Sequence, residues 1–435
     1  MQRNITEQLL KWKAAPGRKP LILNGARQVG KTYIVRDLAK NHYDNLIEIN
    51  FDQASDAKSV FEATKDPSRI LEQLSVAYST KITPGRTLIF FDEIQECPEA
   101  LNSLKYFYEE APDQHVIAAG SLLGIRLAHT SFPVGKVNFL DLHPMSFYEF
   151  LKADGESMQV DYLNGLSNIE PISDLLATKL TEKMKIYFLV GGMPEAVTTW
   201  LTTKDINATR ATQSDILAAY ERDFSKHVSE SEANRISQIW HSISAQLSRE
   251  NKKFVFQVIR EGARAREYEG ALNWLRDAGL VEKILCTKEP KLPLMGYADL
   301  TAFRLYLLDT GLLSNIVDLP SSTILQGDAL FTEYEGALTE NYVLQCLRAS
   351  GAKQLFYHTF DRYKNDFLLQ NDGRIYPIEV KSGSNTPHRS LTVYMDKYHP
   401  NLALRFSPNN LALDGDILNI PLYMAESWRN LVSAK

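Results

Sequence analysis

Short apolar runs alternate with helical patterns over the first third of the chain. The apolar runs are LILNG, LIEINFD, TLIFFDE and HVIAAGS, and the helical patterns between them include residues 31–41 and 98–110. Strands that alternate with helices in this way form a parallel sheet flanked by helices. We therefore predict an α/β domain over residues 1–155.

The pattern changes after residue 155. Residues 174–189 and 208–224 carry apolar side chains at helical spacing and are separated by the turn-prone run GGMPEAV, so we predict a helical connector or lid over residues 156–230. Over residues 231–318, helical segments are followed by GLVEKILC, the loop TKEPKLPL and RLYLLDTGLL. This order is typical of a winged helix.

Residues 319–435 carry a third pattern. A helical stretch, FTEYEGALTENYVLQCLRAS, precedes the strand-like runs LFYHTF, DFLLQ and RIYPIEVKS. Asn371, Asp372 and Gly373 supply a turn between the final two strands. We predict a separate α/β module here.

Composition limits the class of protein. The 435 residues are 44% hydrophobic and 23% charged, which is typical of several folded domains rather than a disordered chain. Three widely separated cysteines give neither a disulfide framework nor metal-ligand spacing, and no apolar run approaches the roughly 20 residues that span a bilayer. We expect a cytoplasmic protein without a membrane partner. The net charge of -5 excludes a protein that coats nucleic acid with its whole surface, but local basic patches can still bind a phosphate backbone.

The run GARQVGKT fits the pattern G-x-x-x-x-G-K-[ST] and lies between a predicted strand and a predicted helix. Backbone N–H groups of such a loop bind phosphates, Lys31 reaches the β and γ phosphates, and the Thr32 hydroxyl binds Mg²⁺. A nucleoside triphosphate and Mg²⁺ are therefore the predicted cofactors, and the lack of an N-K-x-D guanine-reading run favours ATP. The predicted nucleotide-binding residues are Gly25, Ala26, Arg27, Gln28, Val29, Gly30, Lys31, Thr32 and Tyr33.

A second motif, IFFDE, ends another predicted strand. Asp92 is placed to hold the Mg²⁺ ion, and Glu93 to orient or deprotonate the attacking water. Ser121 follows HVIAAG and would contact the γ-phosphate if that strand lies between the other two; a simple strand-ending turn explains it equally well. Arg27 and Arg126 are candidates for charge stabilisation, and solvated surface arginine is the alternative for both.

The ordered motifs GARQVGKT, FFDEIQECPEAL, AAGSLLGI, LHPMSFYEF, LVGGMPEAV, YERDFSK and LLDTGLL resemble bacterial and archaeal ATPases of the AAA superfamily with an uncharacterised C-terminal region, the DUF4143 family. The resemblance implies an AAA-type P-loop core, a winged helix and a restriction-endonuclease-like end. It also implies nucleotide, magnesium, catalytic and sensor roles for Lys31, Thr32, Asp92, Glu93 and Ser121, and favours ATP over GTP. Gly135-Lys136 stands where relatives often carry Gly-Arg, so a finger-like role there is not expected.

Arginines gather in the predicted winged helix. Arg264 and Arg266 lie in or beside a predicted helix that could present them to DNA. The neighbouring acids Glu261, Glu267 and Glu269 dilute this positive charge, and a winged helix that only packs against its neighbours is the alternative.

The last module contains Asp366 on one strand and Glu379-Val380-Lys381 on the next, with Glu340 on the preceding helix. Strand alternation places Glu379 and Lys381 on one face. This is the PD-(D/E)xK arrangement of nucleases, in which Glu340, Asp366 and Glu379 would hold a second Mg²⁺ beside Lys381. An inactive nuclease-like fold, and a plain Glu379–Lys381 pair on a sheet, remain the alternatives.

Two functional hypotheses follow. In the first, an ATP-hydrolysing switch or motor repositions a winged helix and a nuclease-like module on DNA. In the second, a nucleotide-gated regulatory protein with weak turnover recruits a protein partner and no nucleic acid. The sequence leaves the oligomeric state open between monomer, dimer and ring.

Overall fold

The computed structural model describes residues 1–120, 133–226, 228–249, 251–322, 332–383 and 389–433, with only the backbone at residues 55 and 332–334. These residues form two compact units. The N-terminal unit contains Gln2–His143 and Asp277–Leu280. The larger unit contains Met1, Pro144–Arg276 and Val281–Lys435.

The N-terminal unit is built on a five-stranded sheet with the order β2-β3-β4-β1-β5. The neighbouring strands pair in parallel, which confirms the predicted parallel α/β core. The inner strands are buried on both faces, as their near-continuous apolar sequences require. The strands are β1 (Leu21–Asn24), β2 (Asn45–Asn50), β3 (Thr87–Asp92), β4 (His115–Ala119) and β5 (Asn138–Asp141).

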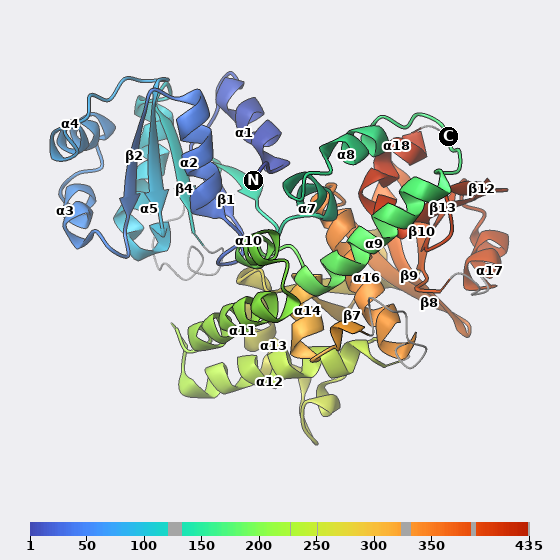
Figure 1. Ribbon diagram of the computed structural model, residues 1–435. Helices are drawn as coiled ribbons and strands as arrows, with labels where there is room; N and C mark the ends of the chain where they lie inside the picture. Colours follow the sequence, from blue (N-terminus) through green and yellow to red (C-terminus); the bar gives the residue numbers. More distant parts are fainter. Residues whose placement is uncertain (121–132, 227, 250, 323–331, 384–388, 434–435) are drawn as a thin grey trace. The chain divides into compact units, whose positions relative to one another are not determined.

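Helices cover both faces of this sheet, with α2 on one side and α5 on the other (Figure 1). The 3-10 turn η1 (Ile94–Glu96) follows β3 directly. The predicted helices at 31–41 and 98–110 are confirmed within a residue. The helices are α1 (Ile5–Ala14), α2 (Lys31–His42), α3 (Ser55–Ala63), α4 (Pro67–Ala77) and α5 (Pro98–Glu110).

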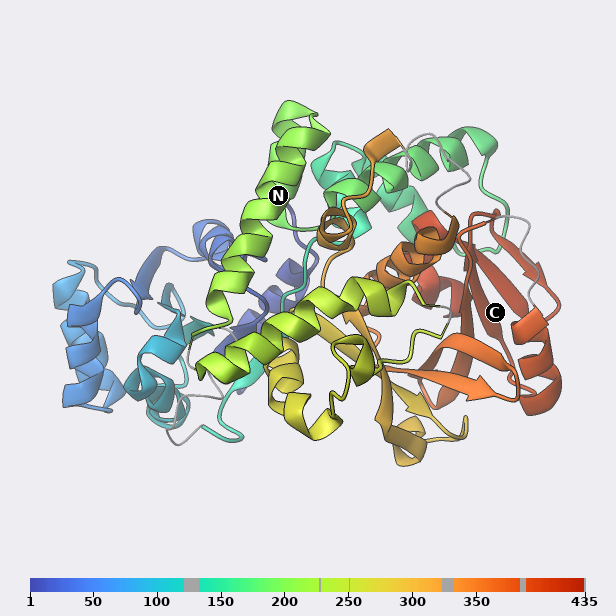
Figure 2. The same cartoon turned by 90° about the horizontal axis from the view of Figure 1, so that it is seen from below.

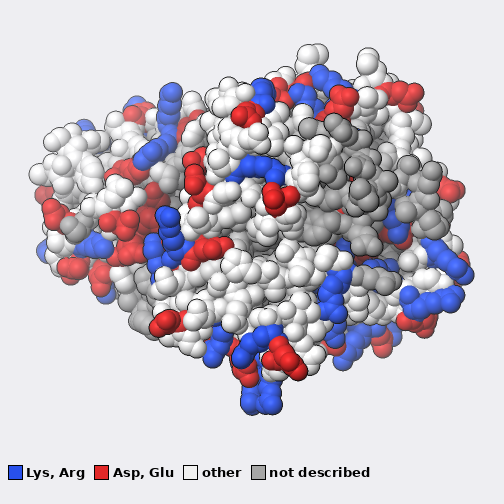
Figure 3. Space-filling view, turned by 60° about the horizontal axis from the view of Figure 1, so that its bottom comes forward, with Lys and Arg blue, Asp and Glu red and all other residues white. Residues whose placement is uncertain are grey.

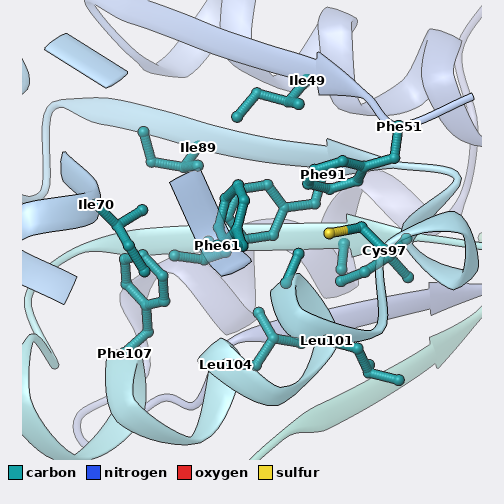
Figure 4. Packing of buried hydrophobic residues seen from close by; sticks show 14 of the residues in the cluster. Ile49, Phe51, Phe61, Ile70, Ile89, Phe91, Cys97, Leu101, Leu104 and Phe107 are labelled. Atoms are coloured by element: carbon teal, nitrogen blue, oxygen red, sulfur yellow. The ribbon is translucent and has the colours of Figure 1, made fainter. Parts of the chain in front are cut away.

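An aromatic core fixes the end of β3. Phe91 lies with its ring centroid 5.2 Å from that of Phe61 on α3 and 5.7 Å from that of Phe51, which follows β2. Phe107 on α5 closes the cluster at 6.2 Å from Phe91 (Figure 4). Tilted and edge-to-face aromatic pairs of this kind stabilise a core beyond the burial of apolar area. The carboxylate of Asp92, one residue further along, is therefore held by a rigid strand.

The larger unit begins with a helical region. The helices predicted at 174–189 and 208–224 are confirmed as α9 and α11, and Figure 2 shows α11 and α12 as two long helices. The helices are α7 (Phe147–Ala153), α8 (Ser157–Asn164), α9 (Asp174–Val190), α10 (Pro194–Thr203), α11 (Ile206–Asp223), α12 (Glu230–Leu247), η2 (Phe256–Val258) and α13 (Ala265–Asp277).

An eight-stranded sheet completes this unit, in the order β12-β13-β11-β10-β9-β8-β6-β7. The hairpin β6–β7, which was predicted as the wing, joins this sheet because β6 also pairs in parallel with β8. The hairpin and the C-terminal strands therefore share one sheet, and the boundary at residues 318–319 stays a prediction. The strands are β6 (Val281–Thr287), β7 (Ala298–Leu307), β8 (Gln354–Phe360), β9 (Tyr363–Asn371), β10 (Arg374–Val380), β11 (Ala403–Ser407), β12 (Ala412–Asp414) and β13 (Ile417–Pro421).

The predicted turn at Asn371–Gly373 does connect β9 and β10, but these are not the final strands. Three more strands follow, and β11 pairs in parallel with β10. The helical elements that accompany this sheet are η3 (Leu294–Tyr297), α14 (Thr310–Ile316), α16 (Thr332–Ala349), α17 (Arg389–Tyr398), η5 (Leu422–Ser427) and α18 (Trp428–Ser433).

A buried polar hub explains two motifs of the larger unit. The Asp309 carboxylate accepts hydrogen bonds from the backbone N–H of Gly192 at 2.6 Å and of Leu312 at 2.9 Å. A Cβ atom at Gly191 would lie 2.2 Å from Asp309 Oδ1, and one at Gly311 would lie 2.4 Å from the nitrogen of Gly191. Glycine is required at both positions because two backbone segments approach each other here. The runs GGMP and LLDTGLL are therefore structural partners.

Candidate nucleotide site

The loop between β1 and α2 has the backbone that phosphate binding needs. Gly25, Gln28 and Gly30 all have positive φ angles, of 151°, 64° and 96°. A Cβ atom on Gly25 would lie 2.4 Å from the carbonyl oxygen of Leu142, so only glycine fits there. The loop ends at the N-terminus of α2, where free backbone N–H groups favour an anion.

Lys31 opens α2 and turns back over this loop. Its Nζ donates hydrogen bonds to the carbonyl oxygens of Gly25 and Ala26, both at 2.8 Å. Burial lowers the pKa of Lys31 to about 8, and the nearby carboxylates of Glu93 and Asp92 oppose part of this shift. An ammonium group held at the loop by two neutral carbonyl groups is ready to exchange them for phosphate oxygens.

The two motifs meet at Thr32 and Asp92. The Thr32 hydroxyl donates a hydrogen bond of 2.9 Å to Asp92 Oδ2, although the residues are 60 positions apart. Burial raises the pKa of Asp92, while the hydrogen bond from Thr32 lowers it in part. A hydroxyl and a carboxylate side by side are the oxygen ligands that Mg²⁺ takes in nucleotide sites. These residues therefore fit the predicted ion.

Glu93 stands immediately after β3 in a left-handed conformation, with φ of 50°. Its carboxylate is half-buried and accepts a hydrogen bond from Gln95 Nε2 at 2.5 Å. A non-glycine residue at positive φ is uncommon and often marks a functional position. Thr32 donates to Asp92 whereas Gln95 donates to Glu93, so these two neighbouring acids have different partners.

Strand β4 lies between β1 and β3, as the sensor role of Ser121 requires. Ser121 itself, together with Arg126, lies outside the described residues, so both roles stay predictions. Among the other predicted nucleotide residues, Tyr33 is exposed and Arg27 is half-buried. Lys136, at the position of the departure from the family pattern, pairs with Glu109 at 3.0 Å.

Arg3 is a residue of this site that the sequence did not reveal. Its side chain is buried and donates hydrogen bonds to the carbonyl oxygen of Val29 at 3.0 Å and to that of His143 at 2.6 Å. Val29 belongs to the phosphate-binding loop. Arg3 therefore joins the loop to the chain that follows β5.

The predicted second metal site lies in the larger unit. Asp366 is on β9 and Glu379 on β10, and the Asp366 Oδ2 atom accepts a hydrogen bond of 2.9 Å from the backbone N–H of Val380. Lys381 Nζ lies 3.1 Å from Glu379 Oε1, as strand alternation predicts. Burial and the charge of Glu340 raise the pKa of Asp366 to about 6. The structure thus brings these groups to one region of the sheet.

Glu340, on α16, has a different set of neighbours from the one predicted. Its carboxylate contacts Lys252, Arg304 and Tyr306. Within the described residues, no group of three His, Cys, Asp or Glu side chains is arranged to hold a metal ion. The three predicted carboxylates therefore do not form a ready three-ligand cluster.

Three family models match successive parts of the chain. An AAA domain matches residues 17–151, a domain of unknown function (DUF8612) matches residues 181–323, and a domain of unknown function (DUF4143) matches residues 335–423. The chain is an AAA-domain protein with a C-terminal DUF4143 domain. The AAA match contains Lys31, Thr32, Asp92 and Glu93, whereas Arg3 precedes it.

Several solved structures are distantly similar to this AAA-domain protein. A Walker-type ATPase of Pyrococcus abyssi is 14% identical, covers 73% of this chain and 96% of its own, and has a TM-score of 0.45. A RuvB variant of Thermotoga maritima is 13% identical, with 66% and 88% covered and a TM-score of 0.27. Drosophila ORC bound to DNA is 12% identical, with 72% and 94% covered and a TM-score of 0.29. No curated protein matches the chain.

The predicted DNA-contacting arginines lie in the DUF8612 domain. Arg266 is in the first turn of α13 and Arg264 directly precedes that helix, and both are exposed. Exposed acids at Glu261 and Glu269 accompany them. Figure 3 likewise shows acidic and basic side chains interspersed over one face of the molecule. Across the described part of the chain, no helix combines the length and the apolar composition that a membrane crossing requires.

Proposed function

We propose that the AAA domain binds ATP with Mg²⁺ and hydrolyses it. The observation that carries this proposal is the 2.9 Å hydrogen bond between Thr32 and Asp92, which unites the phosphate-binding loop with the end of β3. Lys31 and Glu93 flank this pair along the chain. Four side chains with distinct chemistry are thus supplied by two adjacent segments.

Each residue has one task in this proposal. Lys31 exchanges its two carbonyl partners for phosphate oxygens, and Thr32 and Asp92 hold the magnesium ion. Bound magnesium would neutralise the charge that develops on the phosphates. Glu93 accepts the proton of the attacking water, because Thr32 engages the Asp92 carboxylate and Glu93 is the next acid after β3.

Phosphate release by the full-length protein tests this proposal. Wild-type protein should release phosphate from ATP with Mg²⁺ and stop when EDTA is added. Thr32→Val keeps the side-chain shape but removes the hydroxyl, so it should need roughly 10–100-fold more Mg²⁺ for half-maximal rate. Thr64→Val, which changes a half-buried threonine just beyond α3, is the matched control. Equal Mg²⁺ dependence of all three proteins would contradict the assignment of Thr32.

We also propose DNA as a partner of the larger unit, on a separate observation. Arg264 and Arg266 are both exposed and lie at the start of α13, where a recognition helix would present them. Two phosphate contacts would make the binding constant fall as the salt concentration rises. The slope of its logarithm against the logarithm of the salt concentration would be roughly -1.8.

Fluorescence anisotropy with labelled duplex DNA at low salt tests this second proposal. The variant Arg264→Glu with Arg266→Glu should lose binding. Its charge-matched control is Lys65→Glu with Lys81→Glu, at exposed positions of the N-terminal unit. If wild-type protein neither binds DNA nor hydrolyses ATP faster with it, the nucleotide-gated protein with a protein partner is the reading that remains.

A further inference from the structure

A network of charged side chains is buried in the larger unit around Glu340. Lys252 Nζ donates a hydrogen bond of 2.6 Å to Glu340 Oε1, and the two residues are only 8% and 6% exposed. Arg304 on β7 has no exposed surface; its Nη1 lies 3.9 Å from Glu340 Oε2 and donates to the carbonyl oxygen of Asp366 at 3.2 Å. Tyr306 donates to Glu340 Oε2 at 3.1 Å. Both carboxylate oxygens of Glu340 therefore have partners.

The network joins two family domains. Lys252 and Arg304 lie in the segment matched by DUF8612, whereas Glu340 and Asp366 lie in DUF4143. All four belong to the same compact unit. The Arg304 guanidinium also lies 4.3 Å from the ring centroid of Tyr357 on β8, which adds a cation–π contact across the same boundary.

These residues do not fit a divalent metal. Such an ion takes oxygen ligands at roughly 2.0–2.6 Å, and those oxygens must be accessible to it. Here the oxygens of Glu340 are bound to Lys252, Arg304 and Tyr306, and Asp366 Oδ2 accepts from a backbone N–H. The charges of Lys252, Arg304 and Lys364 already act on the two carboxylates of Glu340 and Asp366. An added divalent ion would face the ammonium and guanidinium groups in a medium that screens poorly.

One oxygen of the constellation is less constrained. Glu379 Oε2 is buried and has no hydrogen-bond partner among the described residues, while its other oxygen faces Lys381. If this region bound a metal ion, Glu379 would be a ligand. The Mn²⁺ experiment described below therefore includes Glu379→Gln.

We infer that Lys252 and Arg304 are the permanent counter-ions of Glu340, and that Arg304 also holds the backbone of Asp366 through its carbonyl oxygen. The constellation that resembles a nuclease site is an ionic staple between the DUF8612 and DUF4143 domains, and it binds no divalent metal. The DUF4143 domain is then a scaffold that does not cleave DNA. This inference is independent of ATP hydrolysis by the AAA domain.

A double-mutant cycle measures the interaction between Lys252 and Glu340 in this ionic staple. Lys252→Met and Glu340→Gln each leave a buried charge without its partner, so each should lower the Tm of the larger unit by roughly 6–15 °C. The double variant should lose clearly less than the sum of the two. Lys253→Met, at the exposed neighbouring position, should stay within about 1 °C of wild type. In calorimetry, the unfolding transition whose Tm does not change when ATP is added belongs to the larger unit. If the Tm losses of the two single variants simply added in the double variant, the inference would be overturned.

Mn²⁺ binding supplies a test that does not depend on the folding of Lys252→Met. Electron paramagnetic resonance on full-length Asp92→Asn without nucleotide should detect no tightly bound Mn²⁺, and this protein should not nick supercoiled plasmid. Bound Mn²⁺ that is lost on adding Glu379→Gln or Asp366→Asn would overturn the inference. Bound Mn²⁺ that both variants retain lies elsewhere and agrees with it.

Discussion

Replacing Arg3 with methionine should weaken both the N-terminal unit and its nucleotide site. Arg3 is buried and donates to the carbonyl oxygens of Val29 and His143. Arg3→Met keeps most of the side-chain volume but leaves both carbonyl groups without this donor. The substitution therefore isolates the hydrogen bonds from the packing.

The expected magnitude follows from these two bonds. A hydrogen bond from a charged donor contributes about 1.5–3 kcal/mol, and removing the guanidinium also removes the cost of burying it. We expect the free energy of unfolding of the N-terminal unit to fall by about 2–4 kcal/mol. Because Val29 lies in the phosphate-binding loop, KM for ATP should rise roughly tenfold, which corresponds to about 1.4 kcal/mol.

Arg18→Met is the matched control. Arg18 also donates to two backbone carbonyl oxygens, those of Pro112 at 3.2 Å and Asp113 at 2.9 Å, but it is partly exposed. Water can replace those bonds, so its loss should cost under about 1 kcal/mol and leave KM unchanged. Urea unfolding and steady-state ATP hydrolysis measure both quantities. Equal effects of the two substitutions would refute the positioning role of Arg3.

Three further predictions concern single residues. Because burial holds the pKa of Lys31 at about 8, the Kd for a fluorescent ATP analogue should be flat below that pH and rise up to about tenfold per pH unit above it; a flat profile to pH 9.5 would contradict the role of its ammonium. Gly25→Ala brings a Cβ within 2.4 Å of the Leu142 carbonyl oxygen and should abolish measurable ATP binding in a calorimetric titration; wild-type affinity would refute the geometry. Asp309→Asn replaces one of the two acceptor oxygens of a buried carboxylate and should destabilise the larger unit by about 2 kcal/mol in urea, whereas an unchanged midpoint would show that the bond to Gly192 is unimportant.

The nucleotide site could be predicted because its parts are local in sequence. A strand, a glycine-rich loop and a helix are consecutive in the chain, and an acidic pair directly ends the strand at Asp92 and Glu93. The periodicity of apolar residues placed these strands and helices to within a few residues. The parallel order of the sheet then brings the two motifs together.

Contacts between distant segments could not be predicted in this way. Arg3 reaches residues 26 and 140 positions away, and its sequence context is an ordinary N-terminal one. Lys252 and Glu340 are 88 positions apart, and no motif around either residue indicates that the other is its partner. One signal was present: Arg304 is a lone charged residue in the apolar run AFRLYLL, and a basic side chain that is buried requires an acidic partner.

The C-terminal strands were missed for a related reason. Strand β12 is three residues long and exposed, and β11 and β13 are each five residues long, so their periodicity is too short to stand out. Pairing with β10 and with one another stabilises them in the folded sheet. The wing hairpin likewise looked complete alone, because nothing in its sequence indicates that β6 pairs with β8.

The fate of ATP on Glu93→Gln tests the central proposal most directly. Labelled ATP is incubated with Mg²⁺ and either wild-type, Glu93→Gln or Glu96→Gln protein, and the bound nucleotide is then identified. Glu93→Gln should retain ATP and turn over at least roughly 100-fold more slowly, while the other two proteins should release phosphate and hold ADP. Turnover by Glu93→Gln at the wild-type rate, or no hydrolysis by wild-type protein, would contradict an ATPase centred on Glu93.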